Sequence, residues 1–196
     1  MLVLASASPR RHELLRNAGI AFVVQPTDIP EVPRPAEVPR AFAERMAREK
    51  AQTVFHQRPD DFVLGADTIV IVDAEILGKP RDAADASRML RLLSGLRHQV
   101  TTGVCLVCPQ PRIENQKLET GFEDVRSETT IVTVAALSDD DIRSYISTNE
   151  PMDKAGAYAI QGRASRWISH IEGDYFNVVG LPLALTYRLL REHSAI

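Results

Sequence analysis

The sequence predicts one α/β or α+β domain built on a mixed β-sheet, and two features support this prediction. Helical and β-rich segments alternate along the whole chain, which is typical of these fold classes. The 196 residues suffice for one sizeable hydrophobic core, and no internal repeat, low-complexity tract or clear linker divides them. We therefore expect a single domain over residues 1–196, with two lobes around a cleft.

A short strand and a helix are expected at the start of the chain. Residues 2–5 form an apolar run, which predicts a buried strand. Ser8 suits the N-cap position of a helix over 9–18, and Pro9 suits its first turn. Gly19 then suits the residue that follows the helix.

A proline-rich loop is predicted before the next helix. Residues 26–39 contain five prolines, which favour an extended loop, and a helix follows over about 40–56. The remaining expected elements are strands at 21–25 and 62–72, a turn at 73–75 with a short returning strand, a helix capped by Asp82 and ending near Gly95, β-rich runs at 99–108 and 128–136 joined by a polar hairpin excursion at 109–127, a helix capped by Ser138 and ending near 148, a Gly-rich stretch at 150–162, strand and turn within 166–180, and a final helix over 182–193.

Bulk composition excludes several classes of protein. The net charge is −3 and no basic stripe is present, so we expect no nucleic-acid partner. No segment approaches the roughly 20 apolar residues of a membrane span, and the N-terminus lacks the features of a secretory signal, so we expect a cytoplasmic protein. Cys105 and Cys108 have no partner pair at zinc-site spacing, which favours two reduced strand cysteines.

The stretch SASPRR places arginines where a helix start carries partial positive charge. Arg10 and Arg11 fall in the first turn of the predicted helix, where acidic residues are expected. One interpretation is a phosphate site, in which the guanidiniums and the Ser6 hydroxyl bind an anion at the helix N-terminus. The other is that both arginines extend into solvent while the apolar side of the helix packs.

Two further charged residues lie in apolar surroundings. Lys50 is near the middle of the apolar face of the helix over 40–56, so it either extends to the edge of the core or is directed at an internal anion. Three charges of that helix that lie off its apolar face, Glu44, Arg48 and Glu49, are interpreted as solvated. Asp67 lies inside the apolar run FVLGADTIVIV, where an unpaired carboxylate is costly.

Asp67 therefore needs partners, and Lys50, Lys79 or a divalent ion carried by a phosphate substrate are the candidates. The alternative is a turn-forming Asp at a strand end, ahead of Thr68. Taken together, an anion site, inward lysines and one buried carboxylate suit hydrolysis of a phosphoanhydride, because cations stabilise phosphate charge while the carboxylate activates water.

Six motifs in order resemble the Maf family of nucleotide pyrophosphatases. They are SASPRR, GADTIV, GKPRD, SGLRHQVTTGV, EPMDKAGAYAIQG and GDYFNVVGLPL, and they extend from residue 4 to about 185. The resemblance implies an elongated α/β fold similar to the inosine-triphosphate pyrophosphatase group, with an active cleft between two lobes. It also implies metal-dependent hydrolysis of a nucleoside triphosphate to the monophosphate and pyrophosphate.

The resemblance also implies roles for individual residues. Asp67 would accept the proton of the attacking water, and Glu31 would complete the polar site, with both carboxylates beside a Mg²⁺ or Mn²⁺ ion. The residues implied to hold phosphates and stabilise their charge are Ser6, Arg10, Lys50 and Lys79.

Three positions resemble the branch of the family that acts on dTTP and UTP. These are Arg11, Thr68 and Gln161, and the glutamine amide suits the N3–H and O4 edge of thymine or uracil. Arg11 would then serve the base rather than the phosphate. The resemblance further implies a homodimer, and the family's link to septum formation leaves open a nucleotide-sensing regulator of cell division without significant turnover.

Several other residues have simpler structural interpretations. His98 is interpreted as a structural hydrogen-bonding residue, Trp167 and Tyr175 as packing residues, and Asp174 as structural, whereas Asp153 and Lys154 form either a local pair or part of the substrate site.

Overall fold

The computed structural model describes residues 1–109 and 121–196, which form two compact units. The first unit consists of Met1–Asp67, Thr102–Glu128 and Gly180–Ile196, and the second of Thr68–Thr101 and Thr129–Val179. The chain passes between the units within its long strands. The organisation as a single domain, with two lobes around a cleft, stays a prediction.

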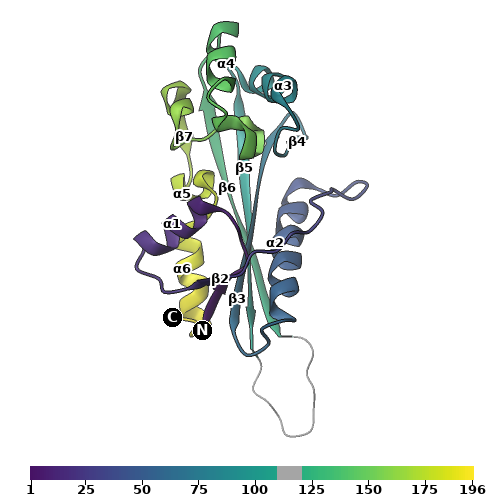
Figure 1. Ribbon diagram of the computed structural model, residues 1–196, viewed down its shortest axis with the longest axis vertical. Helices are drawn as coiled ribbons and strands as arrows, with labels where there is room; N and C mark the ends of the chain where they lie inside the picture. Colours follow the sequence, from purple (N-terminus) through teal and green to yellow (C-terminus); the bar gives the residue numbers. More distant parts are fainter. Residues whose placement is uncertain (110–120) are drawn as a thin grey trace, which may run out of the picture. The chain divides into compact units, whose positions relative to one another are not determined.

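The described residues form one seven-stranded mixed sheet, which confirms the α/β fold class (Figure 1). The strand order is β2-β1-β3-β5-β6-β7, and β4 pairs with β3. Strand β1 is parallel to both β2 and β3, whereas β3 with β4 and β6 with β7 are antiparallel pairs. The strands are β1 (Leu2–Leu4), β2 (Val23–Val24), β3 (Phe62–Val72), β4 (Glu75–Leu77), β5 (Arg97–Cys108), β6 (Phe122–Val134) and β7 (Ile168–Glu172).

In the first unit, helices lie on both sides of the strands. Figure 1 shows α2 (Pro39–Phe55) on one side and α6 (Leu183–Glu192) on the other, with α1 (Pro9–Asn17) beside α6. Residues of α2 share a buried apolar cluster with the strands: Val3, Ala5, Ala47, Ala51, Val54, Phe55, Val63, Cys105 and Val107.

Glycines let the backbone of α2 approach the sheet closely. A Cβ added to Gly65 would lie 2.2 Å from the carbonyl oxygen of Ala47, and one added to Gly103 would lie 2.4 Å from that of Ala43. Such contacts are far shorter than van der Waals distances, so neither position accepts a side chain without movement of the helix. This close packing places Lys50 of α2 against β3.

The two first helices begin and end close to their predicted positions. Ser8 occupies the N-cap position of α1, Pro9 its first turn, and Gly19 follows it with φ 70° and an N–H donated to the carbonyl oxygen of Arg16. Helix α2 begins one residue earlier than expected, at Pro39, because proline fits the first turn of a helix as well as a loop. Strand β2 is shorter than the predicted 21–25.

In the second unit the predicted caps are confirmed. Asp82 accepts a hydrogen bond from the N–H of Asp85 at 2.8 Å, and Ser138 forms a reciprocal capping box with Asp141. Asp73, with φ 47°, and its neighbour form the turn between β3 and β4. The helical segments of this unit are α3 (Ala83–Leu93), α4 (Asp139–Ile146), α5 (Tyr175–Val179) and the 3₁₀ segments η1 (Glu150–Asp153), η2 (Ala155–Ala157) and η3 (Arg163–Trp167).

The polar hairpin expected at 109–127 is partly corrected. Strand β6 already begins at Phe122, so the last part of that segment belongs to the sheet rather than to an excursion, and residues 110–120 lie outside the described residues. Cys105 and Cys108 are free and buried on β5, which confirms two reduced strand cysteines. Burial raises the pKa of the Cys105 thiol to about 12 and that of Cys108 to about 11.

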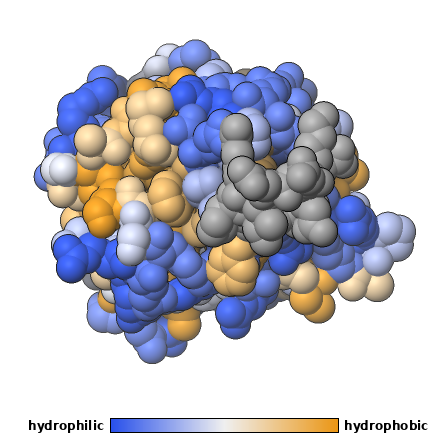
Figure 2. Space-filling view, turned by 90° about the horizontal axis from the view of Figure 1, so that it is seen from below, coloured by the Kyte–Doolittle hydropathy of each residue, from blue (hydrophilic) through white to orange (hydrophobic). Residues whose placement is uncertain are grey.

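Figure 2 shows one face of the molecule, on which hydrophilic residues surround several apolar patches. The large apolar side chains of the first unit that reach solvent are Met1, Val24, Val32, Val38, Phe122, Tyr187 and Ile196. Within residues 1–109 and 121–196, none of the helices combines the length and the apolar character that a membrane crossing requires.

Candidate active site

The centre of the site is an ion pair between β3 and α2. Lys50 Nζ lies 2.6 Å from Asp67 Oδ1, and the two residues are 7% and 5% exposed. Of the candidate partners that the sequence offers for Asp67, Lys50 is therefore one that binds it. Because a buried unpaired charge is costly, each of these residues explains why the other is tolerated in apolar surroundings.

Glu31, from the proline-rich loop, provides a second carboxylate at the same ammonium group. Its Oε1 lies 2.6 Å from Lys50 Nζ, so Lys50 is held between two carboxylates. The Glu31 side chain remains 38% exposed, whereas that of Asp67 is 8% exposed. Lys50 therefore binds one buried carboxylate, that of Asp67, and one that reaches solvent, that of Glu31.

The environment of Asp67 favours the protonated carboxyl. Burial raises the pKa of Asp67 above its ordinary value, and the nearby negative charge of Glu31 adds to this effect. The positive charges of Lys50 and Arg11 act in the opposite direction. A carboxylate with a raised pKa is a better proton acceptor than an ordinary aspartate, which suits general base chemistry.

Strand order explains why the start of α1 comes to the same place. Strands β1 and β3 are parallel, with Leu4 opposite Leu64, so the residues that follow the end of β1 lie near the middle of β3, which continues to Val72. Ser6 comes two residues after Leu4 and Asp67 comes three residues after Leu64. Both side chains are buried, and both approach Arg11.

Arg11 is buried, with 8% exposure, so the interpretation that both arginines extend into solvent is wrong for this residue. It donates from Nη1 to Ser6 Oγ at 3.1 Å and from Nε to the carbonyl oxygen of Gly180 at 2.8 Å. Burial lowers the pKa of Arg11, and the neighbouring charge of Arg10 lowers it further. Arg10 itself is half-buried.

The other candidate substrate residues belong to the second unit. Thr68 directly follows Asp67 on β3 and is half-buried. Lys79 is exposed just after β4, and Gln161 is exposed in the turn that precedes η3. The structure thus brings five of the predicted site residues together within the first unit, and the catalytic or binding role of every predicted site residue stays a prediction. The five are Ser6, Arg11, Glu31, Lys50 and Asp67.

His98 and Trp167 have the structural roles expected of them. His98 is buried, and a hydrogen bond of 2.8 Å joins its Nε2 to the hydroxyl of Tyr158. Burial lowers the pKa of His98 to about 4. Trp167 is buried and packs edge-on against Tyr145, with ring centroids 5.4 Å apart.

Three other interpretations have different outcomes. Asp153 and Lys154 form an ion pair, so the local-pair alternative is confirmed. Asp174 accepts a hydrogen bond from the N–H of Phe176 at the start of α5, as expected of a structural residue. Tyr175 is 39% exposed and its ring contacts that of Phe176, with centroids 5.6 Å apart, so its interpretation as a packing residue stays a prediction.

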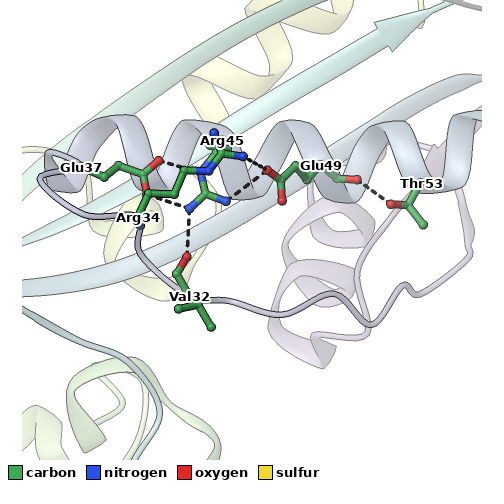
Figure 3. Close-up of polar contacts among 6 residues, drawn as sticks. All are labelled: Val32, Arg34, Glu37, Arg45, Glu49 and Thr53. Carbon is green, nitrogen blue, oxygen red and sulfur yellow. Dashed lines mark hydrogen bonds and ion pairs between the residues drawn. The ribbon is translucent and has the colours of Figure 1, made fainter.

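Sequence reasoning missed a polar cluster between α2 and the proline-rich loop (Figure 3). Its central member is Arg45, which contacts Glu37 of the loop and Glu49 of the helix. Glu49 is therefore an ion-pair partner rather than a solvated charge. The i,i+4 spacing of Arg45 and Glu49 could have indicated the helical pair, but nothing local indicated Glu37.

The fold and this site define a mixed-sheet α/β protein with a buried carboxylate–lysine site next to a serine–arginine helix start. Within that class, the chain belongs to the Maf family: residues 1–193 match the family described as Maf-like protein.

Relatives named dTTP/UTP pyrophosphatase are similar over nearly their full length. The dTTP/UTP pyrophosphatase of Koribacter versatilis (strain Ellin345) is 57% identical over 195 residues, covering 100% of this chain and 95% of the relative. The dTTP/UTP pyrophosphatase of Symbiobacterium thermophilum is 50% identical over 191 residues, covering 97% and 93%. The solved structure of the Staphylococcus aureus Ham1 protein aligns at a TM-score of 0.45 and 15% identity, over 68% of this chain and 71% of that one.

Proposed function

We propose that this protein is a nucleoside triphosphate pyrophosphatase that hydrolyses dTTP and UTP. Its substrate class follows from relatives with that activity that are 57% and 50% identical over almost the whole chain. The structural observation that carries the proposal is the buried Asp67 carboxylate held 2.6 Å from Lys50 Nζ. This arrangement supplies a proton acceptor and a fixed cation within one site.

The reaction is attack of water on the α-phosphorus of the nucleotide. Asp67 accepts a proton from this water as the new P–O bond forms, and the bond from the α-phosphorus to the bridging oxygen breaks. The products are the nucleoside monophosphate and pyrophosphate. Lys50 keeps the Asp67 carboxylate in place and offsets the negative charge that develops on the phosphate oxygens.

Cations at two places bind the phosphate chain. Arg10 stands in the first turn of α1, where the helix N-terminus also favours anions. Lys79 is the exposed lysine that follows β4 and would neutralise charge on the leaving pyrophosphate. The Ser6 hydroxyl, which accepts from Arg11, completes the phosphate contacts.

The donor set at the site fits a hard divalent ion. Among the described residues, no group of three His, Cys, Asp or Glu side chains is arranged to hold a metal alone. Asp67 and Glu31 supply carboxylate oxygens, and Mg²⁺ usually binds through one or two carboxylates together with substrate phosphates. These two residues would thus hold Mg²⁺ or Mn²⁺, and the bound ion would neutralise phosphate charge.

Selection of the nucleobase of the substrate rests on three residues. The Gln161 amide offers a donor and an acceptor, which complement O4 and N3–H of thymine or uracil. Thr68 adds a hydroxyl next to Asp67. Arg11, which is tied to Ser6 and Gly180, fixes the shape of the site beside the base.

The test is pyrophosphate release from a panel of natural and modified triphosphates, with Mg²⁺ or Mn²⁺ supplied. The wild type should prefer dTTP and UTP, and Asp67→Asn should keep its fold while turnover falls on the order of 10² to 10⁴-fold, the usual contribution of a general base. Asp61→Asn is the matched control, because Asp61 pairs with Arg58 away from the site. Its turnover should match the wild type.

Two results would contradict the proposal. Near wild-type hydrolysis by Asp67→Asn would remove Asp67 from the role of base. Tight dTTP binding by the wild type without pyrophosphate release would instead favour the nucleotide-sensing regulator.

Chelation of divalent ions should stop turnover, and added Mg²⁺ or Mn²⁺ should restore it.

The proposal also includes a cytoplasmic homodimer. Exposed apolar side chains of the first unit, such as Phe122 and Tyr187, supply surface of the kind that subunits bury. Light scattering coupled to size exclusion gives the mass directly, and a mass near that of one chain would contradict the dimer.

A further inference from the structure

The loop that carries Glu31 cannot place this residue through its own secondary structure. Residues 25–38 lie between β2 and α2 without a helix or strand. Val32 and Val38, two of its apolar side chains, are 65% and 62% exposed, so their burial does not anchor the loop. The position of Glu31 therefore depends on specific polar contacts with the rest of the unit.

Arg45 of α2 supplies such contacts (Figure 3). It donates to both carboxylate oxygens of Glu37, from Nε at 2.6 Å and from Nη2 at 2.7 Å. Its Nη2 also donates to the carbonyl oxygen of Val32 at 3.0 Å, and its Nη1 to Glu49 at 3.1 Å. One guanidinium thus joins two points of the loop to the helix.

The cluster differs from an ordinary surface ion pair. The side chains of Arg45 and Glu37 are 12% and 10% exposed, and the pair has the two-pronged geometry that strengthens guanidinium–carboxylate contacts. Arg45 also lies over the ring of Phe42, 5.3 Å from its centroid. Isolated exposed pairs contribute little, but networks with this geometry are the recognised exception.

Glu37 also closes the loop on itself. It accepts a hydrogen bond from the N–H of Arg34 at 2.9 Å, and the Arg34 side chain reaches Glu49 at 3.3 Å. The contact with Arg45 lowers the pKa of Glu37 to about 2, so this carboxylate stays charged at neutral pH.

Two adjacent loop residues are consequently held by one helix. Lys50 binds the side chain of Glu31, and Arg45 binds the carbonyl oxygen of the next residue, Val32. The two cations are about 7.5 Å apart along the axis of α2, given the rise of an α-helix. They restrain two successive residues of the loop, which limits where the Glu31 carboxylate can be.

We propose that Arg45 is a positioning residue for the candidate active site, because it holds the loop so that Glu31 stays on Lys50 beside Asp67. The inference rests on the proposed function for its effect on catalysis. The polar contacts of Arg45 are with Glu37, Glu49 and Val32 rather than with Lys50 or Asp67. Its loss should therefore act through Glu31.

The kinetic test is a double-mutant cycle with Arg45→Met and Glu31→Gln. If Arg45 acts through Glu31, each single variant should lower kcat/KM for dTTP at least about 10-fold, and the double variant should be no worse than Glu31→Gln within about twofold. Arg40→Met is the matched control, because Arg40 lies on the same helix with a 70% exposed side chain paired to Glu44. It should keep wild-type kinetics.

Losses that multiply in the double variant would overturn the inference, because they would show that Arg45 and Glu31 act independently. So would wild-type kinetics for Arg45→Met. Glu37→Gln provides a second, milder variant that leaves Arg45 bound to Glu49, and it should shift kcat/KM in the same direction as Arg45→Met.

Hydrogen exchange gives a readout that does not depend on activity. In Arg45→Met, the hydrogen-bonded amides of Arg34 and Glu37 in the loop should exchange about 10-fold faster or more, while α2 and β3 keep their protection. Unchanged exchange in the loop would overturn the inference. Lost protection throughout α2 and β3 in both Arg45→Met and Glu37→Gln would show that Arg45 supports the stability of the whole unit. That result would also overturn the inference.

This measurement separates the two proposals. Faster loop exchange in Arg45→Met, together with a wild type that releases no pyrophosphate from any triphosphate, would leave Arg45 as the residue that positions Glu31 and would reject the proposed function. Pyrophosphate release by the wild type with unchanged loop exchange would do the reverse.

Discussion

At the scale of single residues, the site depends on charges placed where water is scarce. Lys50 and Asp67 are both buried, and each would be costly without the other. The raised pKa of Asp67 shows that burial outweighs the attraction of Lys50 and Arg11. A carboxylate held in this way is poorly solvated and reactive, which is the property that a general base needs.

His98 allows a prediction about stability and pH. Its folded pKa is lowered to about 4 from 6.5, so between these values the unfolded chain binds a proton that the folded chain does not. The stability linked to His98 is present above pH 6.5 and is lost as the pH falls toward 4. The free energy of unfolding should thus decrease by about 2 kcal/mol from pH 7.5 to pH 5 on account of His98.

Urea denaturation of the wild type and of His98→Gln at the two pH values measures this contribution. The variant should lack about 2 kcal/mol of the wild-type decrease, since glutamine does not titrate. His56→Gln, at an exposed histidine, is the matched control and should follow the wild type. Equal pH dependence in all three proteins would contradict the assignment.

At the scale of elements, the approach of α2 to the sheet decides whether Lys50 reaches Asp67. The approach requires glycine at the point of contact, since a Cβ at Gly65 would lie 2.2 Å from the Ala47 carbonyl oxygen. Small residues of α2, such as Ala47 and Ala51, complete this close packing. The geometry of the ion pair is therefore a consequence of packing between a helix and a strand.

Gly65→Ala should push α2 away from β3 and separate Lys50 from Asp67. We expect a loss of about 1–3 kcal/mol in the free energy of unfolding, as for other overpacked sites, together with reduced pyrophosphate release. Gly78→Ala is the matched control for stability, because a Cβ there meets nothing within 4 Å. Denaturant unfolding compares the two variants, and equal stability would contradict the packing interpretation.

At the scale of the whole molecule, the predicted site residues are divided between two compact units. Lys50 and Asp67 belong to the first, and Gln161 and Lys79 to the second. A nucleotide that binds the folded chain should stabilise it, because a ligand that binds only the native state shifts the folding equilibrium.

Ligand-induced stabilisation tests the role of Gln161 without turnover. In the Asp67→Asn background, dTTP with Mg²⁺ at about 100 times its Kd should add about 2.7 kcal/mol to stability and raise Tm. Adding Gln161→Ala should reduce this gain for dTTP, because the nucleobase loses its amide partner. Gln99→Ala, at another glutamine of the chain, serves as the matched control. An equal Tm increase with and without Gln161 would remove it from base recognition.

Much of the fold was predictable because the relevant signals are local. Ser8, Asp82 and Ser138 mark helix starts, and the apolar run at 62–72 is a strand with the predicted bounds. Boundaries were less certain where one residue suits two structures, as Pro39 suits both a loop and a first helical turn. Polarity alone likewise assigned the start of β6 to an excursion, although pairing in the sheet includes Phe122.

The chemistry of the site was predictable for a similar reason. A carboxylate in an apolar strand and a lysine on an apolar helix face violate the ordinary preference for exposed charge, so Asp67 and Lys50 could be singled out from the residues themselves. Their family motifs then assigned roles. The burial of Arg11 was not predictable, because it depends on Gly180, which is 169 residues away in the chain.

Local order and charge placement were sufficient for most helices and strands and for singling out Asp67 and Lys50, and motif resemblance was sufficient for the family. Helix caps and periodicity act over a few residues, and burial of charge is visible in a single strand or helix. Tertiary structure alone joined Glu31 to Lys50 across 19 residues and Val32 to Arg45 across 13. Such contacts depend on how close packing brings a loop to a helix, which is a property of the folded chain.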